Sequence, residues 1–356
     1  MRLRKTLSWT MVFSPVLLLG FISANARLGS SAVPLYPQGQ EGYGDRLAQY
    51  EGLIRTVSRV RDAVWLDPNS PEAIKVVSET IREVERPLPL LESTRLDLSA
   101  DEDCRMPVAR AVQTAAGLLR SEFASALRER DSRRVVRAGI ALLRTSEILK
   151  YADRQSHIRE SAATTQAVRM LRSALPLLKP HELSVLSSAL LAIESTRPHL
   201  TSMFERDLHL FLRLGYSFKM NQKFIDAARV GRSALNDVQA GKPLAKSLDR
   251  ISQWDGGPER ERLWLMLAAW ELCIRDEVET LRAVRELAIE ARFREVKALG
   301  ADPRDMPGLG MPPEMLADPA TGLEAVMRLS QRGVALEWGQ ANADCLAPVR
   351  TLLARR

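Results

Sequence analysis

The feature that most constrains the fold is a run of about forty residues, from Glu259 to Leu299, without proline or glycine. Both residues interrupt helices, so their absence over this length predicts helix throughout the run. The run is longer than an ordinary globular helix. Asp276 followed by Glu279 forms a candidate capping box, and we therefore expect two helices with a break near Arg275–Asp276.

A short apolar segment lies inside this run. Residues 263–274, "LWLMLAAWELCI", are mostly apolar and are interrupted by Glu271. Twelve residues are too few to span a bilayer as a helix. The segment is therefore expected to be a buried core helix.

Helical periodicity also dominates residues 45–257. From Asp45 onward, apolar residues recur at steps of three and four. Ser70 is expected to cap a helix that begins at Pro71 and ends before Pro87. Residues 93–107 are predicted to be a polar connector with an acidic cluster. The helical pattern resumes near residue 108 and runs to residue 241, with predicted breaks near 130–132, 153–157, 179–180, 197–198 and 221.

One segment matches a known helical repeat. In residues 210–235, aromatic and small residues fall at the spacing of a tetratricopeptide unit: Phe211, Leu214, Gly215, Phe218, Phe224, Ala227 and Ala234. Gln222 stands where such units usually have a turn glycine. A second, weaker helix–turn–helix covers residues 121–143, about ninety residues away. Two interpretations remain open, a plain helical-hairpin scaffold and a peptide-binding groove built by stacked repeats.

A different pattern begins after the long helical run. A Pro/Gly stretch from Asp302 to Gly322 leads into residues 323–339, which alternate like two short strands around residues 331–333. A lone hairpin is unstable, so we expect it to pack on the helix at 276–299. The element D-P-A-T-G at 318–322 has the residues of a tight turn. We interpret it as a structural lock for the hairpin, with a docking surface as the alternative.

The N-terminus indicates export. Residues 1–26 have a basic start, an apolar stretch and the sequence Ala24-Asn25-Ala26, which suits a signal peptidase. A cleaved signal peptide and a retained signal anchor both fit this pattern. Residues 27–44 form a Gly/Pro/Ser-rich linker. The remaining chain divides into a helical repeat-like part at 45–257 and a part with long helices, a Pro/Gly loop and a β-hairpin tail at 258–356.

The charge pattern argues against nucleic-acid binding. The formal net charge is +7, and Arg2, Arg4 and Lys5 supply three of these charges. The other basic residues alternate with acidic ones along helices, without the basic clusters and interleaved aromatic residues of a nucleic-acid reader. We expect a protein partner, no nucleic acid, and contact with a membrane only through the N-terminal segment.

The sequence contains no recognisable catalytic constellation. It lacks a nucleophile elbow, a phosphate-binding loop and a zinc-protease motif. The histidines His157, His181, His199 and His209 have no metal-binding spacing, so satisfied or exposed side chains are expected. The cysteines Cys104, Cys273 and Cys345 include no C-x-x-C pair, which leaves buried thiols or an unassigned disulfide. We therefore assign no catalytic, cofactor-binding or metal residue.

The layout resembles a set of uncharacterised exported helical proteins of planctomycete-type bacteria. Similar features are Cys104-Arg105 and the helix pair around "RERDSRRVVRAGIALLRTSEIL". The segments "AIEARFREVKALGADP", "MLADPATGLEAV" and "GVALEWGQANAD" are similar to the end of pseudopilins, where a long helix leads to a D-P-x-[ST]-G element and a hairpin. Ala320 replaces a common aromatic residue, and the pseudopilin methylation motif is absent. The resemblance implies a compartment and an architecture, and no activity.

Taken together, the patterns predict a predominantly all-α protein. It consists of helical hairpins with tetratricopeptide-like packing and carries a small C-terminal β-hairpin. We expect an exported, periplasmic protein of the cell envelope that acts as a non-enzymatic scaffold or protein-interaction module. The alternatives are a component related to a secretion or pseudopilin machine, and a binding protein or enzyme whose site is built from scattered helix residues, notably around His199 and His209.

Overall fold

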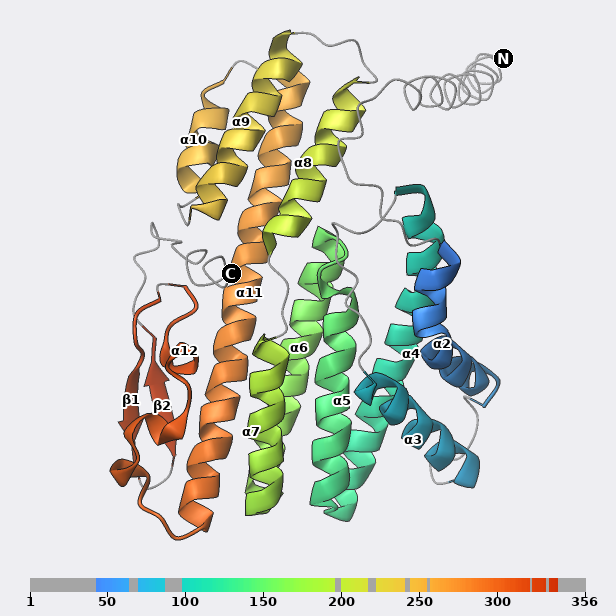
Figure 1. Cartoon of the computed structure of the whole chain (residues 1–356), viewed down its shortest axis with the longest axis vertical. Coiled ribbons are helices and arrows are strands. Elements are labelled where there is room, and N and C mark those ends of the chain that lie inside the picture. Colours follow the sequence, from blue (N-terminus) through green and yellow to red (C-terminus); the bar gives the residue numbers. More distant parts are fainter. Residues whose placement is uncertain are drawn as a thin grey trace, which may run out of the picture.

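The computed structural model describes residues 43–63, 70–86, 98–195, 200–216, 222–240, 244–254, 257–320, 322–330 and 333–338. The prediction of a signal peptide or anchor at 1–26 lies outside these residues. The described chain is predominantly helical, as predicted (Figure 1). Its helices and strands are α2 (Tyr43–Ala63), α3 (Pro71–Glu85), α4 (Leu98–Glu129), α5 (Ser132–Lys150), α6 (Arg154–Ala174), η2 (Leu175–Leu177), α7 (Pro180–Ser195), α8 (Leu200–Tyr216), α9 (Gln222–Gln239), α10 (Ala245–Ser252), α11 (Gly257–Ala298), η3 (Pro303–Asp305), η4 (Pro307–Gly310), α12 (Pro313–Leu316), β1 (Val326–Leu329) and β2 (Val334–Glu337).

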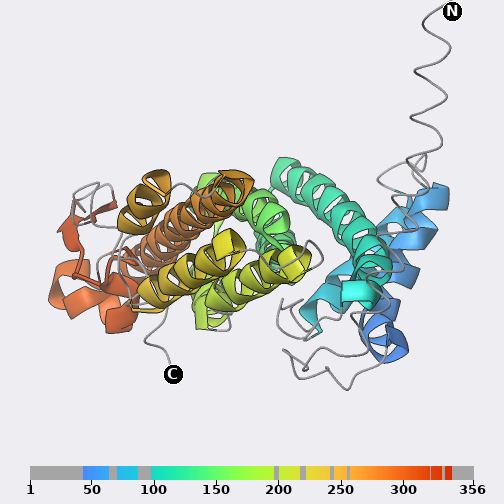
Figure 2. The ribbon, with the colours of Figure 1, turned by 90° about the horizontal axis from the view of Figure 1, so that it is seen from above.

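The elements form two groups along α11: α8, α9 and α10 lie beside its N-terminal half, whereas α7 and the C-terminal strands lie beside its C-terminal half (Figure 1). The C-terminal tail, defined as residues 299–338, lies at one end, and α2 and α3 lie at the other (Figure 2). Between them α11 packs on α6 and α7, and α4, α5 and α6 pack in sequence order. Several predicted boundaries are confirmed. Ser70 caps α3 by accepting a hydrogen bond from the Ala73 amide at 3.1 Å, and Asp153 caps α6.

The long helix α11 is continuous, so the predicted break near Arg275–Asp276 was wrong. Residues on both sides of that point are buried on successive turns, and the Thr280 hydroxyl donates to the Asp276 carbonyl at 2.7 Å. Asp276 lies in the interior of the helix, whereas an N-cap residue stands at its start with non-helical backbone angles. Uninterrupted packing against α6 and α7 outweighs the local capping signal.

The predicted connector at 93–107 was also wrong from residue 98 onward. Helix α4 begins at Leu98 and includes this acidic stretch, with Pro107 inside the helix. Acidic residues in the first two turns suit the positive end of a helix dipole. One interior proline removes a single helical hydrogen bond, which the rest of a 32-residue helix tolerates.

Two hydrophobic cores are arranged along α11. The larger core combines residues of α2 to α7 with the C-terminal half of α11 and the tail. The smaller core combines α8, α9, α10, the N-terminal half of α11 and Tyr151. The prediction that 263–274 is buried holds for one side only. Trp270 is fully buried, whereas Trp264 is 43% and Leu265 55% exposed.

Helices α8 and α9 form the helical hairpin that the repeat match predicted. Ala227 and Ala234 are buried at their interface, and a side chain at Gly231 would overlap Leu208. Small residues therefore let these helices approach closely. Packing of the tetratricopeptide type stays a prediction.

The C-terminal hairpin is confirmed. Strands β1 and β2 pair antiparallel with Val326 opposite Glu337 and Leu329 opposite Val334. Their inward residues Met327, Leu329, Val334 and Leu336 pack against the larger core. The Trp338 indole donates to Glu286 of α11 at 2.8 Å, so the hairpin packs on the predicted helix.

Candidate functional site

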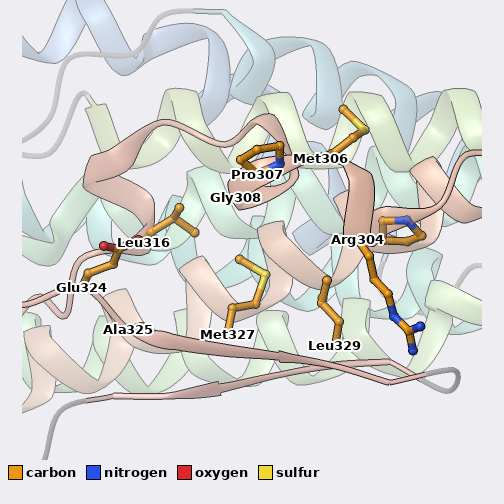
Figure 3. Close-up of a pocket in the computed structure, with 10 residues that line it drawn as sticks. Arg304, Met306, Pro307, Gly308, Leu316, Glu324, Ala325, Met327 and Leu329 are labelled. Atoms are coloured by element: carbon orange, nitrogen blue, oxygen red, sulfur yellow. The ribbon is translucent and has the colours of Figure 1, made fainter.

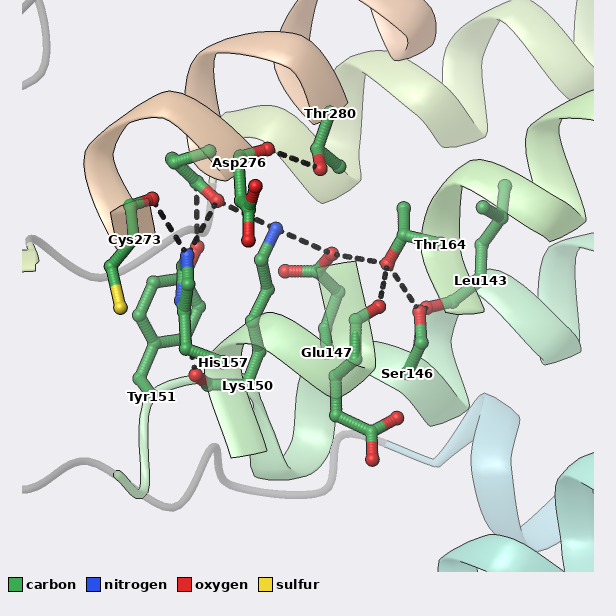
Figure 4. Close-up of polar contacts among 12 residues, drawn as sticks. Leu143, Ser146, Glu147, Lys150, Tyr151, His157, Thr164, Cys273, Asp276 and Thr280 are labelled. Atoms are coloured by element: carbon green, nitrogen blue, oxygen red, sulfur yellow. Dashed lines mark hydrogen bonds and ion pairs between the residues drawn. The ribbon is translucent and has the colours of Figure 1, made fainter. Parts of the chain in front are cut away.

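Four ionisable side chains meet inside the bundle where α5, α6 and α11 come together (Figure 4). Glu147 and Lys150 end α5, His157 lies in the first turn of α6, and Glu277 lies midway along α11. We call these four residues the junction cluster. Each exposes 5% or less of its surface.

Lys150 is held between two carboxylates. Its Nζ lies 2.7 Å from Glu277 Oε2 and 3.7 Å from Glu147 Oε1. The shorter contact is an ion pair and lacks the alignment of a hydrogen bond. The Tyr151 hydroxyl donates to the other Glu277 oxygen at 3.0 Å. A buried ammonium group needs this pairing, because removal from water costs several kcal/mol per ion.

His157 links the turn between α5 and α6 to α11. Its Nδ1 lies 3.2 Å from the Lys150 carbonyl oxygen, and its Nε2 lies 3.1 Å from the Cys273 carbonyl oxygen. Burial is the main cause that lowers the pKa of His157 to about 4, and Lys150 adds to this effect. The imidazole is therefore neutral at pH 7 and can donate to only one of the two carbonyls.

A short hydroxyl network continues from the junction cluster between α5 and α6. The Thr164 Oγ1 lies 2.7 Å from Ser146 Oγ, 2.9 Å from the Glu160 carbonyl oxygen and 3.5 Å from Glu147 Oε1. Ser146 in turn donates to the Leu143 carbonyl at 2.7 Å. These contacts extend the polar layer across the interface of two helices.

Neighbouring groups on the side of the smaller core are also paired. Asp207 of α8 forms an ion pair with Arg154 at 2.7 Å and accepts a hydrogen bond from the Trp270 indole at 2.9 Å. Burial raises the pKa of Asp207 and also that of the Cys273 thiol. Cys273 is a free, buried thiol, so it has the character of a structural residue rather than of a reactive nucleophile.

A second ionic group lies lower on α11 and fixes the tail. Arg285 is buried and donates to Glu194 of α7, with a distance of 3.0 Å from its Nε. The same guanidinium contacts the Ala317 carbonyl oxygen. One turn earlier, Arg282 binds both carboxylate oxygens of Asp318 at 2.9 Å each. Bidentate pairs of this kind combine strength with a fixed geometry.

Asp318 begins the D-P-A-T-G element and is fully buried. Its carboxylate accepts from the Ala320 amide at 3.1 Å, and its carbonyl accepts from the Gly322 amide at 2.7 Å. Gly322 has a φ of +70°, which is costly for other residues. The element is thus a turn clamped onto α11, which agrees with its interpretation as a structural lock.

A pocket of about 250 Å³ lies between β1 and the loop that follows α11 (Figure 3). Met327 and Leu329 point from β1 toward Met306 and neighbouring loop residues. Arg304 and Glu324 stand at its two ends. Most of its lining residues are apolar, and Arg304 and Glu324 supply one group of each charge.

The structure separates the residues that sequence analysis singled out. His157 is buried in the junction cluster, His181 is exposed on α7, and His209 is half-buried on α8. His199, Cys104's side chain and Cys345 lie outside what the structure describes. Among the described residues, no three His, Cys, Asp or Glu side chains gather in a way that could hold a metal ion.

Sequence reasoning missed Lys150 and Glu277, although a signal existed. Residues 136, 140, 143, 147 and 150 follow one face of α5, and this face is otherwise apolar. A charged residue on an apolar face implies a buried partner. The partner of Lys150 lies 127 residues further along the chain, so the sequence pattern alone could not identify it.

The junction cluster contains residue types that are common in active sites, but its side chains are not accessible to a substrate. With at most 5% exposure, none of the four side chains can reach a substrate unless the helices separate. What the arrangement can do is exchange a proton and hold three helices together.

Comparisons with known proteins add no identity. No family model matches the chain, and no curated protein or solved structure is significantly similar to it. Within the residues that the structure describes, none of the helices is both long and apolar enough to cross a bilayer.

Proposed function

We propose that this protein is an exported, non-enzymatic scaffold of the cell envelope that binds a partner protein. The observation that carries this proposal is an apolar stripe on the N-terminal half of α11. Trp264 and Leu265 are exposed there, and Ala268 and Leu272 are half-exposed on the same face. We call these four residues the α11 stripe.

The arrangement of charged groups supports a scaffold rather than an enzyme. Ion pairs at buried and partly buried positions bind helices or the tail to one another. A row of helices also presents an extended surface, which is the usual basis of recognition by helical arrays.

The chemistry of the α11 stripe favours an amphipathic helix as its occupant. Its residues recur at steps of three and four, so the exposed apolar surface is long and narrow. Glu261 lies on this face at one end, and Arg275 lies on it at the other. A partner helix with a basic residue near Glu261 and an acidic residue near Arg275 would match both charges.

Site-specific photo-crosslinking in envelopes of the native host tests the proposal. A crosslinking amino acid at position 264 is expected to capture one defined protein, whereas the same group at Ile74, an exposed residue of α3, is expected not to capture it. The double substitution Trp264→Glu and Leu265→Glu should abolish capture of this protein by a crosslinking amino acid placed at a third position, Arg275. The scaffold proposal would be contradicted if the crosslinked products were the same at position 264 and at position 74, or if no product formed at either.

Export is tested separately by sequencing the N-terminus of the protein isolated from its host. Arg27 as the first residue would indicate a cleaved signal peptide, and retention of Met1 in the membrane fraction would indicate an anchor. An intact protein in the cytoplasm would contradict export while leaving the interaction test valid.

A further inference from the structure

The junction cluster lies where the two hydrophobic cores meet. Residues 263–274 of α11 belong to the smaller core, whereas residues 284–293 belong to the larger one. Glu277 lies between these two segments. Leu149 of α5 belongs to the larger core, and Tyr151, directly after α5, belongs to the smaller. Contacts of the α5–α6 turn with α11 therefore join the two parts of the molecule.

His157 makes the most direct of these contacts, because its ring bridges the Lys150 and Cys273 carbonyls. The titratable side chains that interact with the ring are Lys150 of α5, Tyr151 of the following turn and Glu277 of α11. Other titratable groups of the neighbouring elements are Glu147 on α5, Arg154 and Glu160 on α6, Arg206 and Asp207 on α8, and Cys273 and Asp276 on α11.

Protonation of His157 would have two opposing effects. Both ring nitrogens could then donate to carbonyls, and the imidazolium would lie 3.8 Å from Glu277. However, the new charge would be fully buried and close to the Lys150 ammonium group. Burial is the larger effect and lowers the pKa of His157. Protonation of His157 is therefore unfavourable in the closed form of the protein, in which α11 packs on the α5–α6 turn.

We propose that the junction cluster is an acid-sensitive joint, in which protonation of His157 releases α11 from the α5–α6 turn and opens the smaller core first. This regulation goes beyond the proposed scaffold function and does not depend on it. It would change the position of the α11 stripe relative to the larger core.

The expected size follows from linkage. A group whose pKa is lower in the closed form stabilises that form fully above the open-form value, and this contribution is lost as the pH falls. With an open-form pKa of about 6.5 and a closed-form pKa of about 4, the opening equilibrium should rise about 70-fold between pH 7.5 and pH 4.5.

Cys273 provides a reporter of opening, because its thiol is buried in the smaller core next to His157. The full chain carries Cys104→Ser and Cys345→Ser, so that Cys273 is its one remaining thiol. At each pH, the rate at which Cys273 reacts with 4,4′-dithiodipyridine is compared with the rate for a small thiol. The ratio of the two rates measures protection. We expect protection to fall about 70-fold from pH 7.5 to pH 4.5 while helical circular dichroism is retained.

Two variants separate the effect of His157 from that of other titrating groups. His157→Gln removes the titrating group and should abolish the decrease in protection over this range, because the neighbouring carboxylates whose pKa is raised by burial favour the closed form as the pH falls. His181→Gln changes an exposed histidine and should keep the full decrease. A parent protein with constant protection, or a His157→Gln variant with an unchanged decrease, would overturn the proposal.

A second measurement covers the case in which His157→Gln does not fold. The imidazole of His157 in the parent chain is followed by NMR with labelled histidine. We expect it to titrate well below pH 6.5 and together with the exposure of Cys273. Titration at or above pH 6.5, or exposure of Cys273 before His157 gains its proton, would contradict the joint.

Discussion

One face of α11 is covered along its C-terminal half and exposed along its N-terminal half. Ala268 and Glu286 are eighteen residues apart, which is five turns, so they lie on the same face. Glu286 accepts a hydrogen bond from Trp338, and Arg282 binds Asp318. Near Ala268, by contrast, Trp264 and Leu265 are exposed. On the covered half, charged groups bind the tail, whereas the exposed half presents the apolar α11 stripe between Glu261 and Arg275.

The largest effect is expected from breaking the covered half at Arg285. Arg285→Met should lower the free energy of unfolding by about 3–5 kcal/mol, because it leaves the Glu194 carboxylate buried without its main cation. Urea unfolding measures this loss. Arg285→Met combined with Glu194→Leu should recover much of it, and Arg262→Met, an exposed change on the same helix, should have little effect.

Asp318→Asn should have the next largest effect. The amide keeps the size of the side chain but offers Arg282 only one acceptor, so we expect a loss of about 1.5–3 kcal/mol. Limited proteolysis should also cut the tail sooner. Asp305→Asn, at an exposed position of η3, provides the control. An equal rate of cleavage in both variants would show that the clamp does not retain the tail.

Gly322→Ala should have a smaller effect. A Cβ at a φ of +70° costs about 1–2 kcal/mol, and the turn after Asp318 then closes less readily. Thermal unfolding should show a lower midpoint than in Gly333→Ala, because nothing lies within 4 Å of a Cβ placed at Gly333. Equal midpoints would mean that the turn adapts to the added carbon.

The exposed half should respond least. Trp264→Glu with Leu265→Glu should lower the free energy of unfolding by about 1 kcal/mol or less, because Leu265 is 55% and Trp264 43% exposed and neither is a core residue. Chemical denaturation measures this. A much larger loss would indicate that other parts of the chain cover the α11 stripe. Loss of crosslinking in this variant would then result from unfolding and not from loss of a partner contact.

Sequence patterns predicted the elements that depend on local signals. The Ser70 cap, the break near Asp153 and the turn at Asp318 are all set by residues within four positions of one another. The predictions failed where contacts between residues far apart in the sequence determine the structure. At Asp276 the capping signal was present, but burial of Glu277 against Lys150 keeps the helix continuous.

The candidate site could be predicted only in part. Charged residues on the apolar face of α5 indicate that something buried must pair with them, and this much is visible in the sequence. Which carboxylate supplies the pairing depends on how α11 lies against α5 and α6, and no local pattern encodes this. The same holds for Arg282 and Asp318, which are 36 residues apart.

The length of α11 gives the molecule a mechanical property. Its 42 residues extend for about 63 Å at 1.5 Å per residue, and Glu277 stands near the midpoint like a fulcrum. A bend of roughly 10° there would displace Trp264, about 20 Å away along the axis, by about 3–4 Å. That displacement approaches the spacing of neighbouring side chains on a partner helix. A single proton at the fulcrum could thus shift the register of a contact made at the end of the lever.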